Sequence, residues 1–317
     1  KLISFVDKET GLEKILEPAC GFRLITENTV QEMTAWRVGQ YTKAEDLNKN
    51  RRVRVVEQKQ GELFQKIIYE LRFSHSRIEA EVSLKQGAAV LEFDVKTDWH
   101  ELGNKETGVP QLGFSMPLGY QTSGYLCSIP FGIKKRRELA QDVPCTGFMC
   151  GAAEDGQKPV TVMSDCKYGF RGYHDTINLA LLRSSYDPDE TPDQGEHHFR
   201  IGVGISTSEN EVLTEQYQRF LHPMYACSNS IHPGTLSASD SLLKIKGNVK
   251  VTAVKWAEDG EGMVLRMHSL QGENTPVIIK TCRKVSGVQF TDIAEKRTEK
   301  IAADEKNIRI NLPAYSV

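Results

Sequence analysis

The chain has 317 residues, of which 39% are hydrophobic and 26% charged, and 40 Lys and Arg against 42 Asp and Glu leave a net charge of −2. This length fits two domains or one large all-β unit, and the near-neutral charge gives no indication of nucleic-acid binding. No apolar run reaches the roughly 18 residues that a membrane-spanning helix needs, which excludes a helical membrane protein.

The N-terminus becomes charged at Asp7, too early for a signal peptide, and it has no initiator Met. We therefore expect a fragment, a processed product or a trimmed piece of a longer protein. Seven cysteines are widely spaced and odd in number, a usage that predicts reduced thiols and a cytoplasmic location. Cys145 and Cys150 lack a second Cys or His pair at matching spacing, so a zinc ribbon is not indicated.

The first clear elements are two stretches, at 77–84 and 91–96, in which hydrophobic residues alternate with polar ones. A period of two is typical of a strand with one buried and one solvated face. Asp-Trp-His-Glu at 98–101 directly follows the second stretch. Its Trp could stack on a sugar whose hydroxyls bond the acid and the imidazole. The interpretation we favour is a Trp that anchors a loop, with His100 and Glu101 bonded to the backbone.

A basic run, Lys-Lys-Arg-Arg at 134–137, follows Ile-Pro-Phe-Gly at 129–132. Four charges without interleaved aromatic residues are typical of a solvated hairpin or a subunit contact. Binding of nucleic acid is the weaker interpretation because the total charge is close to neutral.

The segment 181–198 delivers Arg183 to the end of a predicted strand and continues as an acid-rich loop of more than ten residues. Long loops on a rigid β scaffold often carry recognition. The carboxylates could perform acid/base work on a glycosidic bond, bind calcium, or solvate the loop, and we favour the last. We expect neighbouring carboxylates to fix Arg183 in place. His197 and His198 point to opposite faces of a strand and cannot share a metal.

One helix is predicted after these strands. A capping-box pattern at 208–211 precedes apolar residues at helical spacing, and Pro223 ends the segment. A stretch rich in Ser, Asn, Pro and Gly follows at 227–240, where we place the domain boundary. The alternating patterns resume at 249–253 and 308–312, which predicts a small second β-domain. The predicted organisation is a large β-sandwich at 1–236 and a small terminal β-domain at 237–317.

Several familiar enzyme signatures are absent from the sequence. It contains no Gly-x-Ser-x-Gly, no phosphate-binding loop of the Walker type and no His-Glu-x-x-His. The Gly-Val-Gly at 202–204 lies in a strand pattern and lacks a third Gly, so it does not indicate a dinucleotide site.

Read together, the phrases at 98–101, 129–132, 164–170, 181–184 and 193–197 occur in a specific order and spacing. The terminal domain adds Val-Lys-Trp-Ala-Glu-Asp-Gly at 254–260 and Val-Leu-Arg at 264–266. With the opening segment 2–11, they resemble the C-terminal half of the α-mannosidases of glycoside hydrolase family 38. The resemblance covers nearly the whole chain.

This resemblance implies a supersandwich like that of galactose mutarotase, followed by a small C-terminal β-sandwich. It implies that the intact enzyme is a zinc-dependent retaining α-mannosidase that works through a covalent mannosyl–aspartate intermediate. The nucleophile and the zinc ligands belong to an N-terminal catalytic barrel and to the region just after a helical bundle, and none maps onto this chain. We therefore expect the fragment alone to be inactive and to hold no cofactor, with the barrel and an α-mannoside as partners.

The resemblance, together with the loop, nominates Arg183, Asp193 and His197 as substrate-binding residues. An Arg would donate paired hydrogen bonds to sugar hydroxyls, and Asp193 would accept another. The alternative is that the loop only docks the sandwich onto the barrel. Two further functions stay open: a stand-alone carbohydrate-binding module, and an interaction protein that forms homo-oligomers. Departures from the family pattern at 202–206 and 134–137 suggest a bacterial branch.

Overall fold

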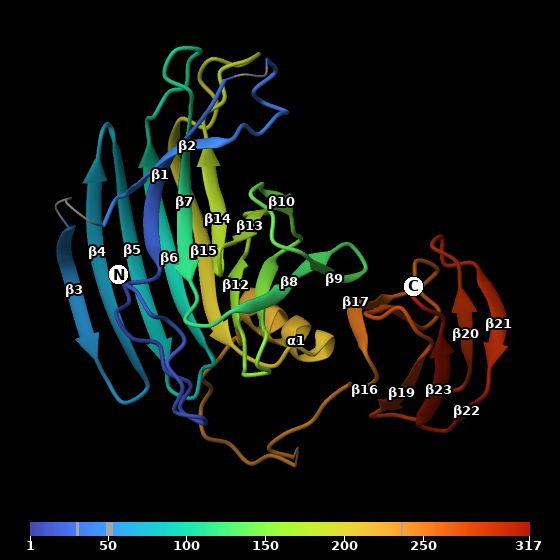
Figure 1. The fold of residues 1–317 in the computed structure, drawn as a ribbon. Coiled ribbons are helices and arrows are strands. Elements are labelled where there is room, and N and C mark those ends of the chain that lie inside the picture. Colours follow the sequence, from blue (N-terminus) through green and yellow to red (C-terminus); the bar gives the residue numbers. More distant parts are fainter. Residues whose placement is uncertain (30–31, 49–52, 236) are drawn as a thin grey trace. The chain divides into compact units, whose positions relative to one another are not determined.

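The computed structural model describes residues 1–29, 32–48, 53–235 and 237–317, and this part of the chain is nearly all β (Figure 1). The predicted mostly-β fold class is confirmed. The chain divides into two compact units, the first made of Lys1–Ile129, Lys134–Ser208 and Glu215–Leu221, the second of Pro130–Ile133, Glu209–Thr214 and His222–Val317. The domain boundary predicted after Leu236 stays a prediction, and Leu236 itself lies outside the described residues.

Two antiparallel sheets contain the strands up to residue 205. The larger has nine strands in the order β3 (Val53–Gln60), β4 (Phe64–Phe73), β5 (Ser76–Lys85), β6 (Val90–Trp99), β15 (Gly195–Ile205), β12 (Val160–Ser164), β11 (Phe148–Ala153), β8 (Thr122–Ile129) and β9 (Gly132–Arg136). The smaller has six, in the order β10 (Val143–Pro144), β13 (Gly169–Tyr173), β14 (Thr176–Arg183), β7 (Val109–Pro117), β1 (Gly21–Glu27) and β2 (Tyr41–Asp46). The predicted stretches at 77–84 and 91–96 are β5 and β6.

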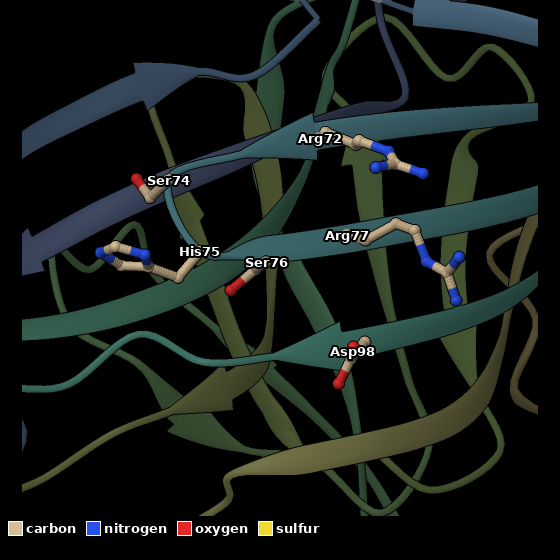
Figure 2. A pocket seen from close by; sticks show the side chains of 6 residues that line it. All are labelled: Arg72, Ser74, His75, Ser76, Arg77 and Asp98. Carbon is tan, nitrogen blue, oxygen red and sulfur yellow. The ribbon is translucent and has the colours of Figure 1, made fainter.

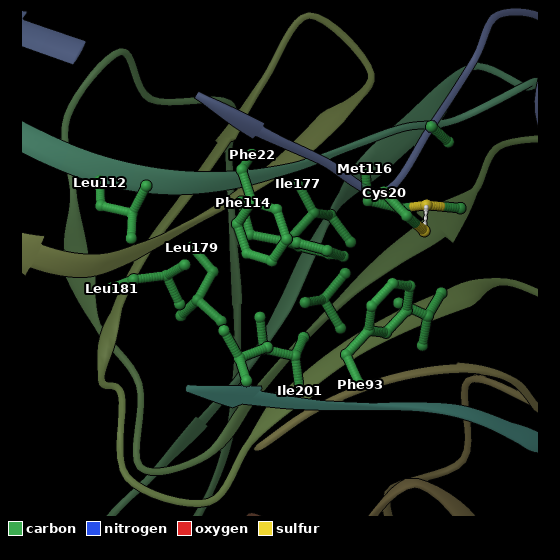
Figure 3. Packing of buried hydrophobic residues seen from close by; sticks show 14 of the residues in the cluster. Cys20, Phe22, Phe93, Leu112, Phe114, Met116, Ile177, Leu179, Leu181 and Ile201 are labelled. Carbon is green, nitrogen blue, oxygen red and sulfur yellow. Dashed lines mark hydrogen bonds between the residues drawn. The ribbon is translucent and has the colours of Figure 1, made fainter. Parts of the chain in front are cut away.

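The core of the first unit lies between these two sheets. Phe93 of β6 packs edge-on against Phe114 of β7, with 5.3 Å between the ring centres, and Phe22 of β1 packs on Phe114 at 5.8 Å. All three rings are buried (Figure 3). Edge-to-face packing of this kind adds to the stability that burial of the rings provides. The two layers therefore form a true sandwich with a shared aromatic centre.

The one helix among the described residues, α1 (Asn210–Leu221), confirms the prediction and ends before Pro223. It packs on the nine-stranded sheet where β15 carries glycine. A Cβ at Gly202 would lie 3.1 Å from the Phe220 ring, and one at Gly204 would lie 2.7 Å from Gln216 Nε2. These two glycines thus make room for the helix, which explains the Gly-Val-Gly pattern without a nucleotide.

The second unit has three small sheets. They are β16 (Leu243–Lys246), β19 (Thr275–Thr281), β23 (Asn307–Leu312) and β22 (Ala303–Asp304) in one sheet, the pair β17 (Val249–Trp256) and β18 (Met263–Ser269), and the pair β20 (Val288–Thr291) and β21 (Arg297–Ile301). Ile308 and Leu312 are buried as the alternation predicts. In β17 a shift of register between Val251 and Ala253 breaks the alternation, and Val251 is exposed.

All seven cysteines are free thiols, four of them buried (Cys20, Cys127, Cys145 and Cys150) and three exposed (Cys166, Cys227 and Cys282). The buried ones act as small apolar residues; Cys20, for example, contacts the Met116 sulfur at 3.6 Å. Among the described residues, no helix is long and apolar enough to cross a membrane.

Candidate functional site

Four connections meet at one end of the sandwich, at the top of the view in Figure 1: residues 28–29 with 32–40, 74–75, 100–108 and 184–194. Hydrogen bonds join them in pairs. Thr29 Oγ1 donates to the Lys105 carbonyl at 3.0 Å, and Gln194 Nε2 donates to the Glu101 carbonyl at 2.9 Å. The Glu101 carboxylate accepts from the His75 amide at 3.1 Å. We call these four connections the loop end.

Trp99, at the end of β6, anchors the loop end from inside. Its side chain is fully buried, and its Nε1 donates to Ser184 Oγ at 2.7 Å. Glu101 accepts from Ser76 Oγ at 2.8 Å, and the His100 amide donates to the same hydroxyl at 2.9 Å. The interpretation of Trp99 as a loop anchor is confirmed, and a buried indole has no free face for a sugar. Glu101 bonds a backbone amide as expected, but the expectation for His100 was wrong, because its Nε2 contacts Asp98 Oδ1 at 2.7 Å. The 98–101 and 181–198 motifs thus form one structure.

Arg183 holds the β1–β2 connection rather than the acidic loop. Its Nε and Nη2 donate to the two carboxylate oxygens of Glu27 at 2.7 and 2.8 Å, and Glu27 is fully buried. Its Nη1 donates to the Thr34 carbonyl at 2.5 Å and its Nη2 to the Arg37 carbonyl at 3.0 Å. The expectation that loop carboxylates fix Arg183 was wrong, because Glu27 of β1 supplies the carboxylate. Four of the five guanidinium N–H groups are therefore engaged.

The β1–β2 and β14–β15 connections are locked together by a second set of bonds. The buried Thr34 Oγ1 accepts from the amides of Tyr186 and Asp187, both at 3.1 Å. In return the Asp187 carboxylate accepts from the Met33 amide at 2.7 Å, and the Asp187 carbonyl accepts from the Ala35 amide at 3.0 Å. These reciprocal bonds hold residues 33–35 and 186–187 against each other.

Asp193 and His197 are brought together, but by a backbone contact. His197 Nε2 lies 2.8 Å from the Asp193 carbonyl oxygen, while the Asp193 side chain is exposed. His198 contacts Asp94 instead, at 2.7 Å, so the two histidines have different partners, as strand alternation predicts. That Arg183, Asp193 and His197 bind substrate stays a prediction.

A polar hollow of about 380 Å³ lies beside the β4–β5 turn (Figure 2). It is lined by Arg72, Ser74, His75, Ser76, Arg77 and Asp98. Of these, only Asp98 belongs to a motif recognised in the sequence. Arg72, Arg77 and Asp98 lie opposite one another on three neighbouring strands. Within the described ranges, no group of three or more His, Cys, Asp or Glu is placed to hold a metal ion. The described residues therefore provide no set of ligands for the zinc that the family resemblance implies.

A buried polar network, also missed from the sequence, lies on the outer face of the six-stranded sheet next to Arg183. Arg171 Nε donates to Asp142 at 2.9 Å, and the Tyr41 hydroxyl lies 3.0 Å from the same carboxylate. The Arg171 guanidinium lies 3.3 Å from the centre of the Tyr41 ring. Burial, followed by the Asp142 charge, raises the pKa of Tyr41 above its ordinary value. This network fastens β2 and the segment before β10 to the sheet.

We expect the stability of this region to depend on pH through Glu70, which lies on the strand that leads to the hollow. Hydrogen bonds from Arg54 and Arg72 lower the pKa of Glu70 below its ordinary value of 4.5. A carboxylate whose pKa is lowered by folding stabilises the folded state at pH values above its pKa in the unfolded chain. This stabilisation is lost as the pH falls through the pKa of the folded state. We expect Glu70→Gln to lower the urea midpoint at about pH 7 and to change it little at about pH 3. The control is Glu79→Gln, directly opposite on β5; an equal effect of both variants would contradict the assignment.

Two family profiles of glycoside hydrolase domains match this chain, one mostly within its first unit and one within its second. "Glycosyl hydrolases family 38 C-terminal domain" matches residues 1–191, and "Glycosyl hydrolases family 38 C-terminal beta sandwich domain" matches residues 248–317. The chain therefore belongs to the family of C-terminal domains found in glycoside hydrolase family 38, as its motifs predict.

Individual relatives agree with this assignment. The chain is 24% identical over 164 residues to an α-mannosidase of Saccharomyces cerevisiae, which covers 50% of this chain and 15% of that protein. It is 31% identical over 154 residues to α-mannosidase G of Dictyostelium discoideum, covering 43% and 14%. The crystal structure of an α-mannosidase from Enterococcus faecalis V583 has the same fold, with a TM-score of 0.74 and 17% identity over 99% of this chain and 39% of that one. The chain thus spans well under half the length of these proteins, and its bacterial origin stays a prediction.

Proposed function

We propose that this chain is the non-catalytic C-terminal region of an α-mannosidase that hydrolyses terminal α-mannosides. The observation that carries the proposal is the match of two family 38 C-terminal profiles, in series, to residues 1–191 and 248–317. The names of the relatives from yeast and Dictyostelium support the choice of α-mannoside as the substrate class. The seven free thiols support a reducing, cytoplasmic setting.

In this proposal the loop end supports the catalytic barrel and borders its sugar site. Arg183 acts as a clamp, because its guanidinium is occupied by Glu27 and two main-chain carbonyls. Asp193, exposed on the β14–β15 connection, and His197, half-buried near the start of β15, are the candidates for contact with sugar hydroxyls. The zinc-dependent, retaining double displacement belongs to the barrel of the intact enzyme, and no residue of this chain is assigned as nucleophile, acid/base or zinc ligand.

The test is an assay of this chain with zinc and an aryl α-mannoside, following release of the phenolate. We expect no release from the chain alone and release after the N-terminal part of the same polypeptide is added. Turnover by the chain alone, well above that of an Arg183→Ala variant, would contradict the non-catalytic role. If the chain binds mannose and its gene encodes no catalytic barrel upstream, the chain is a stand-alone carbohydrate-binding module instead.

A further inference from the structure

Trp36 is displayed on the outside of the loop end. Of the three tryptophans, Trp99 is buried, whereas 68% of Trp36 and 71% of Trp256 are exposed to solvent. Trp36 lies in a tight turn in which the amides of Trp36 and Arg37 both donate to the Met33 carbonyl, at 3.0 and 3.1 Å. Single exposed apolar residues are common on protein surfaces. The support beneath this one is what sets it apart.

The turn is fixed by buried groups on both sides of Trp36. Arg183 binds the carbonyls of Thr34 and Arg37, and the buried Glu27 holds Arg183 in turn. The Thr34 hydroxyl accepts two amides from the β14–β15 connection. A buried carboxylate with its arginine partner and a buried hydroxyl thus order a surface turn that carries an exposed indole. A ligand that binds a pre-ordered group loses less conformational entropy than one that must order it.

The exposed side chains near the turn are of mixed chemistry. Met33 and Val38 flank Trp36, and both are about half exposed. Arg37 is exposed on the turn itself, and Asp189 and Glu190 are exposed on the connection that Asp187 bonds to it. Charged groups of both signs suit a ligand that carries hydroxyls, because a hydroxyl donates to a carboxylate and accepts from a guanidinium.

A pyranose ring matches this chemistry. Its C–H-rich face is apolar and slightly positive, which suits the negative face of an indole. Its hydroxyls can donate to carboxylates and accept from a guanidinium, and both groups are present here. The exposed indole therefore provides a stacking surface for the apolar face of a sugar, and the acidic and basic side chains provide hydrogen-bond partners for its hydroxyls.

We propose that Trp36 is a stacking platform that binds one mannose residue of the glycan substrate. The inference rests on the proposed function for the identity of the sugar, and it adds to the predicted contacts of Asp193 and His197 an aromatic residue that orients the ring. Arg183 and Glu27 are positioning residues for this platform, because they act through the backbone on either side of Trp36.

The experiment is a titration of the ¹⁵N-labelled chain with methyl α-mannoside and with an α-linked mannobiose, following the three indole N–H signals. Trp36→Ala assigns one signal, and Trp256→Ala, equally exposed but in the second unit, is the matched control. We expect the Trp36 signal to move and saturate while that of Trp256 stays in place. Trp36→Ala should weaken binding about tenfold, and Trp256→Ala should not.

Three results would overturn the proposal: no movement of the Trp36 signal, equal movement of both exposed indoles, or sugar binding that Trp36→Ala leaves intact. If Trp36→Ala instead weakens only the association with the added N-terminal part, the turn docks a protein and the sugar platform is wrong. Assay of the intact enzyme on an aryl α-mannoside separates the two proposals. If the intact enzyme is active but the Trp36 signal does not respond to sugar, only the platform is wrong. If the Trp36 signal responds but the intact enzyme has no mannosidase activity, only the proposed function is wrong.

Discussion

Arg183→Ala is expected to lower the free energy of unfolding of the first unit by about 3–5 kcal/mol. The reason is the carboxylate that the substitution leaves behind. Glu27 is fully buried and is held by two hydrogen bonds from Arg183, at 2.7 and 2.8 Å. Without the guanidinium, the buried Glu27 carboxylate loses its charged partner, and the carbonyls of Thr34 and Arg37 lose their donors. Urea unfolding, followed by the fluorescence of the buried Trp99, measures the change.

The control for this prediction removes both charges. In the double variant Glu27→Met/Arg183→Met no buried charge is left unpaired, and apolar side chains of similar length fill the site. We expect it to be more stable than either single alanine variant, because replacement of a whole buried pair is often close to neutral. A loss below about 1 kcal/mol for Arg183→Ala would place this pair among ordinary surface ion pairs and contradict the clamp.

The Arg183–Glu27 pair also shows where prediction from sequence ends. The position of Arg183 at the end of a strand follows from local alternation, and the structure confirms it. Its partner is 156 residues away, and the two meet only because β7 lies between β1 and β14. The register that places Gln111 opposite Arg183 and Val109 opposite Glu27 is a property of the assembled sheet. From sequence alone, the carboxylates of the nearby acidic loop were the plausible partners of Arg183. In the folded sheet Arg183 pairs with the distant Glu27 instead.

Local patterns predicted much of the rest. The alternation in β5 and β6, the capping pattern before α1 and the terminal strand β23 each depend on neighbouring residues alone. Trp36 could not be found in this way, since a loop has no periodicity and the exposure of a side chain depends on what folds over it. A weak signal was available, because Trp36 is one of only three tryptophans and lies in a segment without strand alternation.

Trp99→Ala is expected to be as damaging as the loss of Arg183, at about 3–5 kcal/mol. The indole is fully buried, packs at 6.3 Å from the Phe73 ring and donates to Ser184 Oγ. Its removal leaves a large cavity at the end of β6 and frees the start of the β14–β15 connection. Because this variant removes the fluorescent reporter, unfolding is followed by far-ultraviolet circular dichroism.

Two milder variants separate packing from the hydrogen bond. Trp99→Phe keeps most of the buried ring and loses the N–H donor, so we expect a smaller loss than for alanine. Ser184→Ala keeps the indole but leaves its N–H without an acceptor, which costs about 1–3 kcal/mol. If Trp99 anchors the loop end, both should also broaden the indole signal of Trp36, because the β14–β15 connection holds the Trp36 turn through Thr34. Destabilisation that leaves the Trp36 signal unchanged would show that the two tryptophans belong to independent parts of the site.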